Sequence, residues 1–142
     1  MRRKNYLWFN ARIMILNIPL RPFPAVRSNR NSSWTERTQE YHWKMNNLRF
    51  YTNPYREQII KSLISWEYMI QFIFAMPDSW SKKKKLEMNG KPMQSRPDTD
   101  NLFKSFTDTV FWKDKTYNDC EIWNNVYSKV WWEKDMIVFI SD

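Results

Sequence analysis

The sequence predicts a single α+β domain over residues 1–142, with a mixed, roughly four-stranded sheet covered by about three helices. Residues 66–75 alternate with the period of a strand, and they lie between segments whose apolar residues recur at helical spacing. The chain has 142 residues, of which 42% are hydrophobic and 18% aromatic, which is enough for one core. The expected order is strand, helix, helix, strand, helix, strand, strand, which is typical of helices packed on a sheet.

The chain is predicted to begin with a strand and a basic loop. Residues 12–18 form a short apolar run that ends at Pro19, and residues 19–33 combine three prolines with three arginines. Prolines at this density predict an extended loop rather than a helix. Such a loop can lie along a phosphate backbone through arginines such as Arg27, or it can be a solvated connector.

Two helices are predicted to follow this loop. Residues 33–36 have the spacing of a capping box, and a helix is expected over 34–49. A break follows, because Asn53 can cap a new helix and Pro54 suits its first position. The second helix is expected over 54–64.

The middle of the chain is predicted to hold a strand and the longest loop. One face of the strand at 66–75 is strongly aromatic, which suits burial against the helices or, alternatively, a platform for stacked bases. Residues 81–97 are expected to be a basic loop. Its charge run is either a solvated face or a phosphate clamp, and consists of Lys82, Lys83, Lys84 and Lys85.

The C-terminal part is predicted to contribute a helix and a hairpin. A helix is expected over 98–111, followed by a polar turn at 112–117. Strands are expected over 121–131 and 136–140, joined as a hairpin by the turn at 133–135.

The charge balance favours an anionic partner. Lys and Arg total 23 and Asp and Glu total 15, which gives a net charge of +8. Nucleic acid is the first candidate for such a partner. The alternative is a basic surface that serves only solubility.

The residue inventory excludes several enzyme classes. The single glycine, Gly90, cannot build a Gly-rich phosphate loop, and one His with one Cys cannot build a structural zinc site. Cys120 is expected to be a buried strand residue, and His42 a packed or surface residue. Any hydrolytic chemistry must therefore depend on carboxylates, lysines and a metal ion.

The sequence shows no candidate membrane span, because its apolar runs are short and interrupted. Asn10 and Arg12 interrupt any signal-peptide core. Cys120 cannot form an internal disulfide, which fits a reducing compartment. The expectation is a soluble cytoplasmic protein without a membrane partner.

Four aspartates and a lysine lie around the start of the helix predicted at 98–111. Asp100, Lys104 and Asp108 recur every four residues, Asp98 can point to the same side, and Asp119 follows a short gap. Crowded carboxylates repel one another, and a divalent cation with hard oxygen ligands removes that conflict. The pattern therefore fits a magnesium site for phosphodiester hydrolysis. The simpler alternative is a helix cap, a solvated charge ladder and a turn residue.

The same residues carry a resemblance to a known family. Residues 96–104 read Arg-Pro-Asp-Thr-Asp-Asn-Leu-Phe-Lys, Asp108 follows, and residues 119–122 read Asp-Cys-Glu-Ile. This resembles the signature of the RusA family of Holliday junction resolvases, which is a basic residue, Pro-Asp-x-Asp-Asn-Leu-x-Lys, an Asp four residues on, and Asp-Asp-x-Gln-Ile/Val. The run Met-Pro-Asp-Ser-Trp-Ser at 76–81 resembles the phage-type branch. The resemblance covers about residues 66–142 well.

The resemblance implies a magnesium-dependent endodeoxyribonuclease, with manganese as an alternative metal. The enzyme would act in DNA recombination and repair, cutting four-way junctions as a homodimer in the cytoplasm, of the host cell if a phage encodes it. Asp98, Asp100 and Asp119 would hold the metal, Lys104 would assist catalysis, and Asp108 would orient Lys104. The expected contacts to DNA are Arg27, Lys82, Lys83, Lys84, Lys85, Arg96 and Lys129.

Two departures from the family pattern keep rival interpretations open. The paired Asp-Asp of the family is Asn118-Asp119 here, and Glu121 replaces Gln as either an extra ligand or an exposed strand residue. The first rival is a catalytically impaired RusA-like protein that binds branched DNA without cutting it. The second is a basic scaffold that binds protein.

Overall fold

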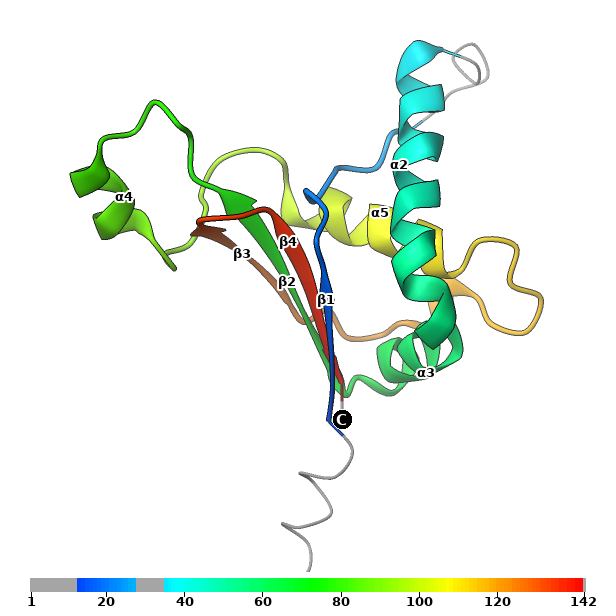
Figure 1. The fold of residues 1–142 in the computed structure, drawn as a ribbon. Helices are drawn as coiled ribbons and strands as arrows, with labels where there is room; N and C mark the ends of the chain where they lie inside the picture. The colour runs from blue at the N-terminus through cyan, green and yellow to red at the C-terminus, as the bar shows by residue number, and fades with distance from the viewer. Residues whose placement is uncertain (1–12, 28–34, 142) are drawn as a thin grey trace, which may run out of the picture.

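The computed structural model describes residues 13–27 and 35–141, and it confirms an α+β domain with a mixed sheet (Figure 1). The predicted positions 12, 30 and 33–34 lie outside the described residues. The four strands follow the spatial order β1-β4-β2-β3. They are β1 (Met14–Ile18), β2 (Tyr68–Ala75), β3 (Tyr127–Trp132) and β4 (Met136–Ser141).

β3 and β4 do not form the hairpin that the short turn predicts. β2 lies between them, parallel to β3 and antiparallel to β4. The turn passes over the end of β2, where the Ala75 amide donates to Asp135 Oδ1 at 2.8 Å and the Met76 amide donates to the Trp132 carbonyl at 2.9 Å. The hairpin prediction was wrong because these contacts satisfy the strand ends without direct pairing of β3 with β4.

Three helices cover one face of the sheet: α2 (Glu36–Thr52), α3 (Arg56–Ser65) and α5 (Thr99–Val110) (Figure 1). The core between helices and sheet is built from large apolar side chains. Its largest fully buried members include Phe72, Phe74, Phe106, Phe139, Met45 and Leu48. The aromatic face of β2 is therefore buried, as the commoner of the two interpretations expected.

The helix boundaries differ from prediction at two caps. α2 is capped by Thr35, whose side chain accepts from the Thr38 amide at 3.3 Å, so the helix begins at Glu36 rather than at the predicted residue 34. The first residue of the predicted capping box at 33–36 lies outside the described residues. Asn53 does not cap a separate helix. It is the C-cap of α2 and opens a 3₁₀ helix, Asn53–Tyr55, that leads directly into α3. Pro54 lacks an amide proton, and the tighter turn accommodates it without a loop.

The lysine run is helical, contrary to the predicted loop at 81–97. It forms α4 (Lys82–Met88), capped by Ser81, whose side chain accepts from the Lys84 amide at 3.2 Å. Lysine is a good helix former, and such a cap stabilises a helix by about 1 kcal/mol. The ring of Trp80 lies 4.3 Å from Lys84 Nζ and packs edge-on against Trp131. These local contacts outweigh the repulsion among the solvated lysines.

The chain between α4 and α5 follows the outer edge of β3. Gly90 has φ +78°, which is the left-handed conformation that glycine adopts without strain. The Gly90 amide donates to the Trp131 carbonyl, and further along the chain the Met93 amide donates to the Lys129 carbonyl. This pairing fixes the path of the chain toward the start of α5.

The helices α2, α3 and α5 all lie on the same face of the sheet, and none of these three covers the other face (Figure 1). Alternate residues on this face remain open to solvent: Ile15 is 60% exposed, Met69 40% and Trp132 37%. Ile15 lies opposite Ile140 on β4, and Ile140 lies opposite Met69 on β2, so these three side chains form one apolar row. Among the described residues, no helix is long and apolar enough to span a membrane.

Candidate active site and nucleic-acid interface

The predicted metal-binding residues Asp98 and Asp100 lie at the start of α5. Asp98 occupies the N-cap position in extended conformation, but its side chain makes no capping hydrogen bond, so the exposed carboxylate is available to a ligand. Asp100 Oδ1 accepts the Asn101 amide at 2.9 Å. Two carboxylates at a helix N-terminus are electrostatically favoured by the helix dipole.

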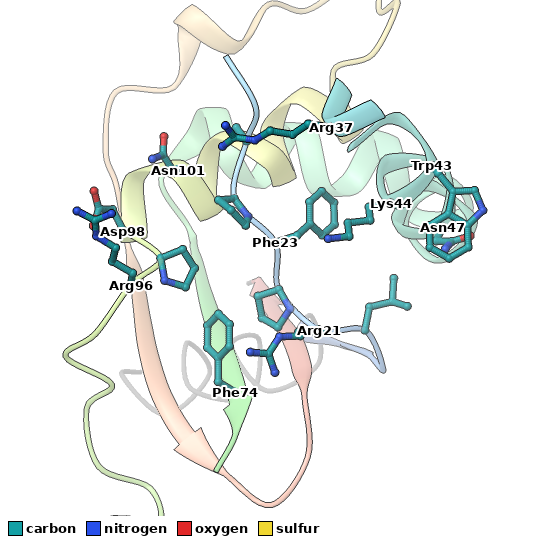
Figure 2. A pocket seen from close by; sticks show the side chains of 15 residues that line it. Arg21, Phe23, Arg37, Trp43, Lys44, Asn47, Phe74, Arg96, Asp98 and Asn101 are labelled. Carbon is teal, nitrogen blue, oxygen red and sulfur yellow. The ribbon is translucent and has the colours of Figure 1, made fainter. Parts of the chain in front are cut away.

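Asp98 lies at the edge of a hollow with a volume of about 840 Å³ (Figure 2). We call it the basic hollow. α2 contributes one wall, residues 20–25 contribute the floor, and the segment before α5 contributes the other wall. Its lining includes four cations, Arg21, Arg37, Lys44 and Arg96, and a single carboxylate, Asp98.

The floor of the basic hollow is held rigidly against α5. The Ala25 amide donates to the Asn101 carbonyl at 3.0 Å, and Ser105 Oγ donates to the Phe23 carbonyl at 2.6 Å. Phe23 and Phe74 are buried beneath it. The prolines of this segment restrict its backbone further. The predicted extended loop is therefore a fixed surface at residues 20–25.

Two of the four cations in the hollow form ion pairs, and two have no ion-pair partner among the described residues. Arg21 pairs with Asp135 at 3.2 Å, and Lys44 pairs with Glu40 at 3.3 Å. Arg37 and Arg96 form no ion pair within the described parts of the chain, and both are exposed. These two guanidinium groups are therefore the ones free to bind an anion.

Lys129 fixes the segment that carries Arg96. Its ammonium group donates to the carbonyls of Ser95 and Pro97, the latter at 2.7 Å. The Arg96–Pro97 peptide bond is cis. Lys129 was predicted to contact phosphate, and that contact stays a prediction, but its observed role is to hold the turn before Asp98.

Lys104 and Asp108 form the ion pair that their spacing predicts, at 3.1 Å. A third residue joins them: the Tyr41 hydroxyl on α2 donates to Asp108 Oδ2 at 3.0 Å. Burial, followed by the charge of Asp108 and this hydrogen bond, raises the pKa of Tyr41, so the hydroxyl keeps its proton. Asp108 is thereby tied between α2 and Lys104.

Asp119 lies in a different local structure from the one predicted. The expected strand at 121–131 begins only at Tyr127, and Asp119–Glu121 is a 3₁₀ helix. A capping box explains the difference: Asn118 Oδ1 accepts the Cys120 amide at 3.1 Å, and the Asn118 amide donates to Glu121 Oε2 at 2.8 Å. Glu121 is exposed, as predicted, but it is a capping residue rather than a strand residue.

The turn that leads to Asp119 is held by Asp114. Its Oδ1 accepts the amides of Thr116 at 2.9 Å and Tyr117 at 2.7 Å, and Arg56 pairs with Oδ2 at 3.1 Å. The two amide hydrogen bonds are the main cause of a lowered pKa for Asp114. Asp114 therefore stays ionised and holds the turn closed at neutral pH.

The three aspartates predicted to share a metal have different surroundings. Asp98 lines the basic hollow, whereas Asp119 lines a second hollow of about 420 Å³ together with Asp108 and His42. The charge of Asp100 acts on Tyr127 of β3: burial, and to a lesser extent this charge, raises the pKa of the Tyr127 hydroxyl. Within residues 13–27 and 35–141, no three His, Cys, Asp or Glu side chains form a group that could hold a metal ion. The metal site therefore stays a prediction.

The remaining predicted site residues lie on the surface. Arg27 is exposed, and so are the first three lysines of α4, whereas Lys85 is half-buried. α4 projects from the far end of the sheet, away from α2 (Figure 1). Cys120 was expected in a buried strand and is exposed in the 3₁₀ helix instead, and His42 is exposed with its ring edge-on to Trp112.

Sequence reasoning missed three residues that the structure brings to these hollows. Arg37 and Trp43 on α2 line the basic hollow, and Tyr41 contacts Asp108. The helical spacing of residues 37, 44 and 47 places them on one face, and this was the available signal. No local pattern showed that this face would lie opposite Asp98.

A basic α+β domain, with an exposed carboxylate in the same hollow as two arginines that form no ion pair among the described residues, has the features expected of a protein that acts on nucleic acid. A scan against protein-family models matches the family described as Endodeoxyribonuclease RusA over residues 19–141. The chain therefore belongs to the RusA family, and it is an endodeoxyribonuclease, a hydrolase of DNA. Searches of curated proteins and of solved structures found no match.

Proposed function

We propose that this protein is a magnesium-dependent, structure-selective endodeoxyribonuclease that resolves Holliday junctions by paired phosphodiester hydrolysis. The family match over residues 19–141 carries this proposal. The exposed Asp98 at the edge of the basic hollow supports it, because that arrangement brings an acidic group and phosphate-binding arginines to one place.

Asp98, Asp100 and Asp119 are the proposed metal ligands. Carboxylate oxygens are the donors that magnesium prefers, with manganese as an alternative, so the chemistry of this donor set fits. A bound divalent ion would supply charge stabilisation and lower the pKa of a water molecule. In the described arrangement the three side chains do not form one group, so Asp119 is the ligand whose contribution most needs a direct test.

Lys104 is the proposed catalytic cation, and its surroundings show how it would be positioned. The ion pair with Asp108 and the hydrogen bond from Tyr41 restrict Lys104 to one side of α5. An ammonium group held in place can stabilise charge that develops on a phosphate oxygen without further reorganisation. Asp108 and Tyr41 are positioning residues in this proposal.

The alternative is a protein that binds branched DNA without cutting it, and Asn118 is the observation that favours it. The family has an Asp at this position, and the amide cannot supply a negative charge. Asn118 does, however, form the capping box that shapes the Asp119 turn. The shape of this turn is therefore compatible with either function, and cleavage assays separate them.

We further propose a homodimer that pairs through the sheet face opposite α2, α3 and α5. A four-way junction is two-fold symmetric, and one chain offers one set of carboxylates, so a two-fold dimer would supply matched sites. The apolar row of the exposed Ile15 and Met69 with the half-buried Ile140 between them is the surface that supports this assembly.

A cruciform plasmid tests paired cleavage. A dimer that cuts both strands of one junction converts the plasmid to linear product, and light scattering at micromolar concentration should report twice the mass of one chain. Ile15→Lys should give monomers that leave singly nicked circles. A wild-type monomer that yields only nicked circles would refute the paired mechanism and leave the metal site standing.

A further inference from the structure

The basic hollow has a second feature that phosphate binding does not explain. Trp43 on α2 lines it, the residue is 63% exposed, and no other ring or cation in the described residues packs against its indole ring. Figure 2 shows Trp43 on one side of the hollow, with Asp98 and Arg96 on the other. An exposed tryptophan beside unpaired arginines is typical of a surface that stacks nucleic-acid bases.

The shape and charge of the hollow favour an unpaired strand over a duplex. A duplex keeps its bases stacked inside, so it would present only phosphates and groove edges to this surface. An unpaired strand can place a base on Trp43 and its phosphates on Arg37 and Arg96, the two cations of the hollow that form no ion pair with any described residue. The volume of about 840 Å³ lies within the range of pockets that enclose a small ligand.

The rigidity of the hollow supports the same assignment. The floor at residues 20–25 is bonded to α5 by the Ala25 amide and by Ser105 Oγ. The Lys129 ammonium fixes the turn that carries Arg96. A preformed site loses little conformational freedom when a flexible strand binds to it.

We propose that the basic hollow binds an unpaired segment of the DNA strand, with a base stacked on Trp43 and the following phosphates led past Arg37 and Arg96 toward Asp98. This inference rests on the proposed nuclease function for the fate of the strand, but the binding itself needs no metal. Unpaired or weakly stacked nucleotides at a branch point enter such a site at the smallest energetic cost.

The test measures binding in EDTA, where no cleavage occurs. Fluorescence anisotropy compares a labelled single strand of about ten nucleotides with its duplex. Trp43→Ala should weaken single-strand binding by roughly 5- to 150-fold, the loss of one stacked base, while Trp43→Phe retains most of the affinity. Duplex binding should not change.

Charge and stacking are separated by the salt dependence. Trp43→Ala should leave the slope of log affinity against log salt unchanged, because the indole is uncharged. Arg37→Gln should lower that slope by about 0.7, the value for one phosphate of a single strand. Phe50→Ala is the matched control: Phe50 is on the same helix and 76% exposed, but it does not line the hollow.

A strand with abasic positions gives the decisive comparison. This strand keeps every phosphate but lacks bases at the abasic positions. Wild-type protein should therefore bind it more weakly than the intact strand, whereas the Trp43→Ala variant should bind the two strands equally. The inference is overturned if Trp43→Ala binds the intact strand normally, or if it loses duplex affinity equally. A thermal melting midpoint of the Trp43→Ala variant equal to that of the wild-type protein excludes unfolding as the cause of its weaker binding. If the wild-type protein binds the single strand through Trp43 but does not cut a junction in the presence of magnesium, the result would refute the proposed nuclease mechanism alone.

Discussion

Two basic regions of this molecule differ in how they are assembled. The lysines of α4 are consecutive in the sequence, whereas the cations of the basic hollow come from positions 21, 37, 44 and 96. The lysines are distributed around a short helix, because successive residues of a helix point in directions about 100° apart. The arginines of the hollow converge on one surface beside Asp98. The basic region that is easiest to recognise in the sequence, α4, is therefore the one whose charges converge least on a single surface.

The difference has a functional consequence. A solvated lysine helix attracts any polyanion and loses that attraction as salt rises. The hollow combines unpaired guanidinium groups, an exposed tryptophan and a carboxylate on a rigid floor. We therefore expect α4 to contribute to the affinity for any DNA, and the hollow to determine where the DNA strand lies and whether it is cut.

The largest expected effect comes from the carboxylates. Asp98→Asn and Asp119→Asn should each lower cleavage by more than about 100-fold, because loss of a metal ligand should exceed the 10–100-fold effects of outer-shell changes. Junction binding should persist or tighten, since one repulsive charge is removed. Single-turnover cleavage and anisotropy measure the two effects. Undiminished cleavage by Asp119→Asn would refute the three-aspartate site and would favour a centre confined to the start of α5.

The paired change Arg37→Gln with Arg96→Gln is expected to have the next largest effect. Charge-assisted hydrogen bonds are worth about 1.5–3 kcal/mol, so single-turnover cleavage at saturating protein should fall by more than about 10-fold. The control is Lys82→Gln with Lys83→Gln, which removes the same charge from α4. Equal losses in the two variants would abolish the distinction between the regions.

Tyr41→Phe should have a moderate effect. It removes the hydrogen bond to Asp108 and should lower the free energy of unfolding by about 1–2 kcal/mol, because the acceptor is a partly buried carboxylate. Cleavage should fall only a few-fold, since Lys104 keeps its ion pair. Urea denaturation measures the first effect. Tyr55→Phe is the control, as its exposed hydroxyl has no hydrogen-bond partner among the described residues.

Replacement of Lys82, Lys83, Lys84 and Lys85 by Gln should have the smallest effect on cleavage. Glutamine preserves helix propensity, so α4 should remain folded while its charge is lost. Binding to all DNA forms should weaken uniformly, with the salt slope reduced by up to about 0.9 for each phosphate contact removed. Cleavage at saturating protein should be retained. An unchanged slope would leave the run as a solvated face only.

The parts of the fold with strong local patterns could be predicted. α5 follows from its apolar stripe, and β2 from its period of two. The parts decided by tertiary contacts could not be predicted. β2 separates β3 from β4 although a short turn joins them, and the local sequence does not specify this pairing. The error at residues 119–121 has a different cause: Asn118 and Glu121 have the local spacing of a capping box, which closes a 3₁₀ turn, and the prediction overlooked it.

The candidate site was predictable only in part for the same reason. The motif at 96–104 predicted Asp98 as a metal ligand, which stays a prediction. The same motif with the following Asp108 predicted the Lys104–Asp108 pair, and the structure shows that pair. Trp43 and Arg37 were missed, because their place in the lining of the basic hollow arises from the packing of α2 opposite the start of α5. A hollow made from distant segments leaves no contiguous motif.

The most direct test of the account is cleavage of a synthetic four-way junction with and without magnesium. The wild-type protein should bind the junction in both conditions and should cut it, in paired positions, only when the divalent ion is present. Asp98→Asn should bind without cutting in either condition. Binding without cleavage by the wild-type protein, at any magnesium or manganese concentration, would contradict the nuclease mechanism and favour the non-cutting alternative.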